Sequence, residues 1–276
     1  MSTLHAIVLG IVQGLSEFLP ISSSGHLEIV PWLFGWDDLA DRPDVDLTFD
    51  VALHLGTFVG ALVYFRRDIV VLAAAAFRVL RTRRVDTDDE RMAMLLVVAS
   101  LPAATIGAVL DAVLDGAYGP IWVIGVMLIV FGLVLGWADR LPERREITAF
   151  RPRDAVLMGF AQALALQPGV SRSGATISMG RWLGFTRDAA TRISFLMSLP
   201  IIGGAAAYKG LDVFVVGDGL PAGFAAPFAW GMASAAVTGF VAVWGLLRVL
   251  RTWSFAPFVW YRIVLGANVI VLAAVR

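Results

Sequence analysis

One segment of this chain occurs twice at a constant offset, and each copy carries polar residues into a stretch that is otherwise as apolar as a membrane interior. Charged and titratable groups such as Glu17, His26 and Arg172 are costly in hydrocarbon, so they normally face a protein interior or a watery cavity with a function. Two such copies predict a single site built from both halves of the chain. The matching positions are Gly10, Gln13, Ser22, Ser24 and Gly25 in the first copy and Gly159, Gln162, Ser171, Ser173 and Gly174 in the second.

The composition indicates a polytopic membrane protein. Of the 276 residues, 58% are hydrophobic and the mean hydropathy is +0.78, whereas soluble domains are roughly 45–50% apolar. Several apolar runs have about the 20 residues that span a bilayer, and they lack the alternating pattern of barrel strands, so we expect helices. The runs lie near residues 47–65, 92–114, 119–138, 193–208, 224–247 and 256–275.

Several other classes of protein and site are excluded. The chain contains no cysteine, which rules out disulfides and thiolate metal sites. Its 22 basic and 22 acidic residues balance, so nothing indicates a nucleic-acid partner. The stretch from Leu4 to Pro20 lacks a basic flank and carries Glu17, which argues against a cleaved signal peptide. We therefore expect one integral domain over residues 1–276 in the cell membrane, surrounded by lipid, with an oligomer allowed.

Arginine placement predicts the topology. Arginines gather in residues 66–91 and 140–153 and in the pair Arg248 and Arg251, and the positive-inside tendency places all three groups in the cytoplasm. The segments between them, residues 111–120 and 209–223, are expected outside. The six spans then cross the membrane in alternating directions, with every arginine group on the cytoplasmic side.

The two motif segments, residues 4–34 and 154–185, must each enter and leave by the same face if every arginine group is to stay on one side. We therefore interpret each as a re-entrant helix-turn-helix, the first dipping in from outside and the second from inside. The predicted fold is an all-α inverted-topology repeat, with halves near residues 1–138 and 154–276, whose two tips meet near the midplane.

The first tip carries the parts of a reactive site. Gln13 and Glu17 are spaced i, i+4 and share one helix face. Pro20 stops that helix, and the serines that follow, Ser22 to Ser24, suit the N-cap of a second helix with free amides at its start. His26 lies in the first turn of this second helix.

The second tip predicts an anion site. Pro168 and Gly169 break the helix, and Ser171 to Gly174 again open onto a helix start. Amide termini that face each other beside Arg172 favour an anion, and the planar guanidinium suits phosphate oxygens. A carboxylate, an imidazole, hydroxyls and an arginine at one pocket are the parts needed for phosphoryl transfer. The oxygens of Gln13 and Glu17 also suit a Mg²⁺ or Ca²⁺ ion that bridges phosphates.

Other polar residues have plainer interpretations. Ser22 and Ser24 could equally bond back to the backbone or pack. A lone intramembrane histidine such as His54 is expected to be a hydrogen-bonded packing residue, and Asp50 to lie at the rim of the pocket. Residues 68–90 form one long polar connector, which we expect to expose its arginines and aspartates to solvent.

The two motifs resemble those of the undecaprenyl-diphosphate phosphatase family, integral membrane enzymes linked to bacitracin resistance. The first motif runs from Gln13 to His26 and the second from Pro168 to Thr176, and residues 49–67 also resemble the segment that follows the first motif in that family. Gln13 stands where many members have Glu, which removes one carboxylate from the metal site.

The resemblance implies hydrolysis of a C55 isoprenyl diphosphate to the monophosphate carrier of cell-wall precursors, with a divalent cation, at a site open to the outer face. Glu17 and Gln13 would position the cation or polarise the nucleophile. Ser23 is the preferred nucleophile with His26 as acid or base, and the reverse assignment, attack by His26, stays open. The residues expected to bind phosphate are Ser22, Ser24, Ser171, Arg172, Ser173 and Thr176.

A second hypothesis belongs to another class of protein. Inverted repeats with broken helices also build secondary transporters, so an anion transporter or a lipid-phosphate flippase is the alternative. Glu17 and His26 would then relay protons, and Arg172 would hold the substrate.

Overall fold

The computed structural model describes residues 1–39, 41–113, 119–211, 219–250 and 253–276. In these residues the regular structure is helical, apart from one isolated bridge between Arg145 and Phe185. Six helices are long and apolar enough to cross a membrane, which confirms the predicted all-α polytopic fold. They are α3 (Pro43–Tyr64), α5 (Asp88–Val113), α6 (Ile121–Asp139), α9 (Arg187–Leu211), α10 (Ala225–Val249) and α11 (Ala256–Val275). Arg251 and parts of both predicted outer segments, 114–118 and 212–218, lie outside the described residues.

Each motif segment forms a helical hairpin. The first consists of α1 (Thr3–Phe18) and α2 (Ser23–Phe34), and the second of α7 (Pro152–Leu164) and α8 (Arg172–Trp182). The longest of these helices, α1, has 16 residues and a length of roughly 24 Å, which is less than the ~30 Å hydrocarbon core of a bilayer. Their lengths therefore fit helices that enter and return rather than cross.

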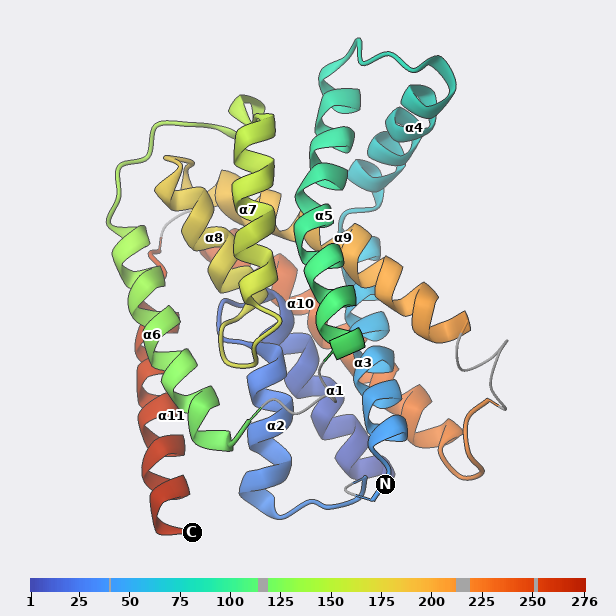
Figure 1. Cartoon of the computed structure of the whole chain (residues 1–276), viewed down its shortest axis with the longest axis vertical. Helices are drawn as coiled ribbons and strands as arrows, with labels where there is room; N and C mark the ends of the chain where they lie inside the picture. Colours follow the sequence, from blue (N-terminus) through green and yellow to red (C-terminus); the bar gives the residue numbers. More distant parts are fainter. Residues whose placement is uncertain (40, 114–118, 212–218, 251–252) are drawn as a thin grey trace.

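The two hairpins point toward each other from opposite ends of the molecule. In Figure 1, α1 and α2 occupy the lower half, α7 and α8 the upper half, and their turns approach in the middle. The turns touch, because the Gly169 amide donates to Ser22 Oγ at 3.1 Å and Ser173 Oγ donates to the Leu19 carbonyl at 3.0 Å. The meeting of the two tips was a prediction from the sequence, and the structure confirms it.

The two turns share one unusual backbone conformation. Ser22 and Ser171, which are equivalent in the repeat, have φ values of 78° and 72°, a region that L-residues rarely adopt. Each serine is the N-cap of the helix that follows, and its hydroxyl accepts from the amide of Gly25 or Gly174. The sharp turn therefore aims the amide-rich starts of α2 and α8 at the shared centre.

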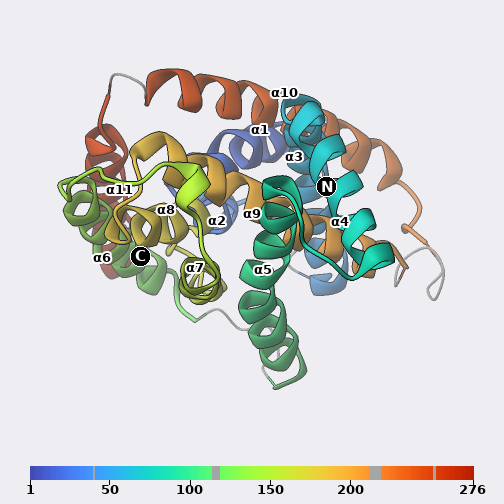
Figure 2. The same ribbon diagram turned by 90° about the horizontal axis from the view of Figure 1, so that it is seen from above.

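Glycines bring each hairpin close to a neighbouring span. Gly10 of α1 lies against the Gly231 carbonyl of α10, and the equivalent Gly159 of α7 lies against the Ala99 carbonyl of α5. Small residues of this kind allow backbones to approach in membrane proteins. Seen from above (Figure 2), α1 lies beside α10, and α6 lies beside α11. Because the equivalent glycines of α1 and α7 both contact a spanning helix, these contacts support the interpretation of the two halves as a repeat.

Most of the predicted polar connector is a helix, α4 (Arg66–Thr82), which follows α3 after Phe65 alone. Ala75 and Val79 are buried on one face of α4, and Arg78 Nε donates to Glu90 of α5 at 3.0 Å. Charged residues at both ends of this segment indicated a polar connector, although the apolar residues between them have helical spacing.

We expect Gly10→Ala to destabilise the protein by about 1–3 kcal/mol, the usual cost of overpacking, because the added Cβ would overlap the Gly231 carbonyl and the Ser234 hydroxyl. Gly204→Ala is the matched control, since no atom lies near the new Cβ there, and alanine favours a helix by up to about 1 kcal/mol. Thermal unfolding in detergent measures both. Equal midpoints for the two variants would contradict the close contact of α1 with α10.

Candidate active site at the meeting of the hairpins

The Glu17 carboxylate is the centre of the site. It lies in the last turn of α1, and 5% of the residue is exposed. Its Oε1 accepts from Arg172 Nη2 at 2.7 Å. Its Oε2 accepts from Ser23 Oγ at 2.6 Å and from Gln13 Nε2 at 3.1 Å. The structure therefore joins the first tip to the second through a carboxylate, a hydroxyl and a guanidinium.

His54 is a further neighbour of Glu17. Its Nε2 lies 3.5 Å from Glu17 Oε2, while its Nδ1 donates to the Asp50 carbonyl at 2.8 Å. The sequence predicted a hydrogen-bonded packing residue at this position, which agrees with the bond to Asp50, but it did not indicate that α3 presents the ring to the Glu17 carboxylate. Asp50 is half-buried one helical turn away. The position of His54 depends on how α3 rotates against α1, which its sequence neighbours do not reveal.

Arg172 is held from two sides. Besides the bond to Glu17, its Nη1 donates to the Ser194 carbonyl of α9 at 3.4 Å. Its side chain is only 12% exposed, so the guanidinium is largely withdrawn from solvent with its charge balanced by Glu17. A phosphate that reached this pair would meet N–H groups already oriented by the protein.

His26 makes its hydrogen bonds with Ser22 and Tyr261 rather than with Glu17. A carbonyl can only accept, so Nδ1 carries the hydrogen in its 2.6 Å bond to Ser22. In the neutral ring, Nε2 then accepts from the Tyr261 hydroxyl of α11, also at 2.6 Å. The two rings stack with centroids 5.6 Å apart. Tyr261 is a partner that the sequence did not identify.

The hydroxyls predicted to bind phosphate divide into two groups. Ser22, Ser171, Ser173 and Thr176 are buried and engaged within the protein as caps or links between helices. Thr176 Oγ1, for example, donates to the Arg172 carbonyl at 2.7 Å and pairs with Ser194 Oγ. Ser24 is half-buried and makes no hydrogen bond with its side chain in the described part of the chain. Phosphate binding by any of these residues stays a prediction.

A second arginine ties the two tips to the spans. Arg262 of α11 is fully buried, and it donates to the carbonyls of both turns: to Pro20 at 3.1 Å, Gly169 at 2.9 Å and Val170 at 3.0 Å. Its Nε donates to the Leu128 carbonyl of α6 at 3.1 Å. Arg262 was not among the predicted site residues, although a lone arginine inside the apolar run 256–275 is a usable signal.

The oxygens near Glu17 are compatible with a divalent cation bound together with substrate. Gln13 Oε1 is buried and has no hydrogen-bond partner, although the Nε2 of the same amide donates to Glu17. The described residues contain no group of three or more His, Asp or Glu side chains that could hold a metal ion. Magnesium is commonly held by one or two carboxylates together with substrate phosphates, and one carboxylate beside one free amide oxygen fits that pattern.

Comparison with known proteins identifies the family. A family model described as bacitracin resistance protein BacA matches residues 6–268, which include both hairpins and Arg262. This chain belongs to the BacA family.

Curated BacA relatives match nearly end to end. An undecaprenyl-diphosphatase of Pelobacter propionicus is 47% identical over 273 residues, covering 98% of this chain and 97% of the relative. One from Geobacter sulfurreducens is 46% identical over 272 residues, with 98% of each chain covered. A third, from a Nocardioides species, is 45% identical over 278 residues, with 98% of this chain and 96% of the relative covered.

We expect Arg262→Gln to lower the free energy of unfolding by at least about 3 kcal/mol, because hydrogen bonds from charged groups are lost and buried carbonyls are left unpaired. Thermal unfolding in detergent measures the change. Arg153→Gln, on the exposed start of α7, is the matched control and should unfold like the native protein. An Arg262→Gln midpoint equal to that of the control would show that the tips do not depend on this side chain.

Proposed function

We propose that this BacA-family protein hydrolyses undecaprenyl diphosphate to undecaprenyl phosphate and inorganic phosphate, which regenerates a lipid carrier for cell-surface synthesis and confers resistance to bacitracin. The observation that carries the proposal is the contact of Glu17 with both Ser23 and Arg172. A hydroxyl bonded to a carboxylate beside a guanidinium supplies nucleophile, base and charge clamp for phosphoryl transfer. The names of the relatives supply the substrate.

The geometry favours Ser23 as the nucleophile with Glu17 as its base. Ser23 Oγ attacks the terminal phosphorus while its proton moves to Glu17 Oε2, the oxygen 2.6 Å away. The bond from that phosphorus to the bridging oxygen breaks, and the lipid monophosphate leaves. Water then hydrolyses the phosphoserine to release inorganic phosphate and restore Ser23. Arg172 stabilises the charge that develops on the transferred group.

His26 has a separate place in this scheme. Its contact with Tyr261 occupies the Nε2 that a nucleophilic histidine would use. Protonated at both nitrogens, it would serve as the acid for the leaving lipid phosphate through Nε2, and this role also requires Tyr261 to release Nε2 or to relay its proton. Attack by His26 to give a phosphohistidine is the competing assignment, and it requires that Tyr261 release the ring.

A divalent cation, Mg²⁺ or Ca²⁺, would bind Gln13 Oε1 and the Glu17 carboxylate together with the diphosphate oxygens. Such an ion neutralises phosphate charge. The unpaired Gln13 oxygen supports this role. In this arrangement Gln13 serves where other members place a second carboxylate.

The site would open to the outer face of the cell membrane. The arginine-rich segments, which flank α7 and α4, mark the cytoplasmic side. The hairpin of α1 and α2 begins at the opposite end of the molecule from α7 (Figure 1), and it carries Glu17 and Ser23. A lipid diphosphate in the outer leaflet would therefore approach along this first hairpin. Neither the geometry nor the relatives favour the transporter alternative.

The purified protein in detergent should release inorganic phosphate from undecaprenyl diphosphate, because hydrolysis needs no membrane compartments. Glu17→Gln should reduce the rate by roughly 10²–10⁴-fold, the usual contribution of a general base. Asp37→Asn, at an exposed carboxylate outside the cluster, should leave the rate unchanged.

A chelator in the same assay tests the cation separately. Removal of the cation should lower the rate of phosphate release, and added Mg²⁺ or Ca²⁺ should restore that rate. Absence of phosphate release would refute the proposed function. A rate that the chelator leaves unchanged would refute the cation alone.

A phosphorylated intermediate should form on Ser23. Rapid quenching with radiolabelled substrate, followed by peptide mass spectrometry, locates the label, and acid stability distinguishes phosphoserine from phosphohistidine. Ser23→Ala should abolish the label, whereas Ser24→Ala, at the adjacent hydroxyl without a carboxylate contact, should retain it. Label on His26 would refute the assignment to Ser23.

A further inference from the structure

Helix α4 has two apolar faces, and only one of them is covered by protein. Ala75 and Val79 are buried, and Leu72 lies on the same side of the helix. Val70, Phe77 and Leu80 are 69%, 66% and 75% exposed. Their spacing of seven and three residues places them along one stripe, roughly opposite the buried face. Exposed Ala73 belongs to the same stripe.

The stripe is bordered by positive charge. Residues 66–84 contain six arginines and a single acidic residue, Asp68. In helical projection the exposed Arg66 lies in line with the stripe and Arg81 borders it, near its two ends. An amphipathic helix with a basic border is the pattern of a segment that lies in the interface of an anionic membrane.

The connections of α4 keep it at the membrane boundary. It begins directly after α3 and leads through residues 83–87 into α5, and both of these helices are long enough to span the bilayer. Figures 1 and 2 both place α4 at the edge of the molecule. The stripe therefore lies where two spans reach the surface, within reach of lipid headgroups.

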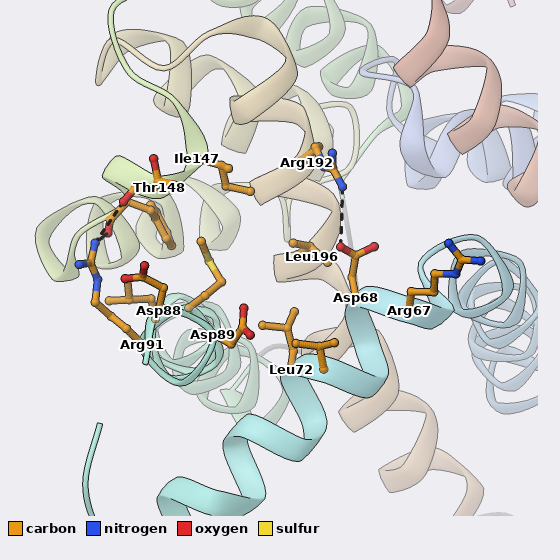
Figure 3. Close-up of a pocket in the computed structure, with 14 residues that line it drawn as sticks. Arg67, Asp68, Leu72, Asp88, Asp89, Arg91, Ile147, Thr148, Arg192 and Leu196 are labelled. Atoms are coloured by element: carbon orange, nitrogen blue, oxygen red, sulfur yellow. Dashed lines mark hydrogen bonds and ion pairs between the residues drawn. The ribbon is translucent and has the colours of Figure 1, made fainter. Parts of the chain in front are cut away.

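The rest of the protein supports α4 from one side only. A cavity of about 420 Å³ lies between α4, α5, α9 and the segment 147–150. Figure 3 shows Asp68 reaching across it to Arg192 of α9, with Leu72 and Leu196 on its walls. The Asp68–Arg192 pair is long, at 3.7 Å, and exposed pairs of this kind contribute little.

We propose that α4 is an interfacial anchor, whose stripe inserts into the headgroup region of the cytoplasmic leaflet while its arginines bind anionic phospholipids. The arginines of α4 complement anionic headgroups, and the connections to two membrane spans keep the stripe at the bilayer surface. We therefore expect lipid, rather than protein, to cover the stripe. The proposal concerns a surface away from the Glu17 cluster and does not rest on the enzymatic activity.

The chain has no native cysteine, so single-cysteine labels report without background. A fluorophore at Ala73→Cys in the stripe is compared with one at Val85→Cys in the 83–87 connection and one at Val264→Cys on the exposed face of α11. Vesicles contain either phosphatidylglycerol or phosphatidylcholine alone. One quencher is attached to lipid and a second is dissolved in water. Together they measure whether each label is exposed to lipid or to water.

In phosphatidylglycerol vesicles, the label at position 73 should be quenched by the lipid-borne quencher, as at position 264, and protected from the aqueous one. The label at position 85 should show the reverse. Adding Arg66→Gln and Arg81→Gln should move the label at position 73 toward the behaviour of position 85, and vesicles of phosphatidylcholine alone should do the same. Phosphate release in detergent should be unchanged in this variant, which verifies its fold.

Two results would overturn the proposal. The label at position 73 could be as open to the aqueous quencher as position 85 in phosphatidylglycerol vesicles, which would make the stripe a solvated surface. It could instead be shielded from both quenchers and lie close to the same label on another molecule, which would make the stripe an interface between copies.

Discussion

Four backbone carbonyls at the centre of the molecule accept hydrogen bonds from one buried side chain, Arg262. Broken helices leave carbonyls without intrahelical partners, and in a membrane interior such groups must be paired by protein. Arg262 pairs them at both turns at once and connects them to α6. Without this side chain, the carbonyls of both turns would be buried without partners, and the direct bonds of Gly169 to Ser22 and of Ser173 to Leu19 would have to hold the two tips together.

The cluster around Glu17 is itself a buried ion pair, which is a weak source of stability because both charges lose water. The ion pair instead orients the polar side chains around it. Arg172 is oriented by Glu17 and by the Ser194 carbonyl, and Ser23 is aimed at the same carboxylate. A substrate phosphate would meet groups that are already desolvated and positioned, which is how an active site lowers the reorganisation required during reaction.

Features that are local or repeated could be predicted from the sequence, whereas features that depend on how helices rotate against one another could not. The spans, the serine caps and the meeting of the tips follow from hydropathy, from the i to i+3 relation of Ser22 to Gly25, and from arginine placement. The contact of His54 with Glu17 and the bond of His26 to Tyr261 do not, because they join residues that are tens to hundreds of positions apart in the chain. Helix α4 was not predicted for a simpler reason, since charged residues at both ends of its segment concealed an apolar spacing.

By itself, the sequence determined that this is a helical membrane protein with two opposed polar hairpins that carry a carboxylate, hydroxyls and an arginine at their tips, because the cost of placing polar groups in lipid restricts where such residues can lie. Only the tertiary structure decided which of those side chains touch. It placed Ser23 rather than His26 on Glu17, and it brought His54 to the same carboxylate. The reason is geometric: close packing at glycines such as Gly10 sets the rotation and depth of each helix, and a hydrogen bond forms only when two atoms arrive within about 3 Å in the right direction.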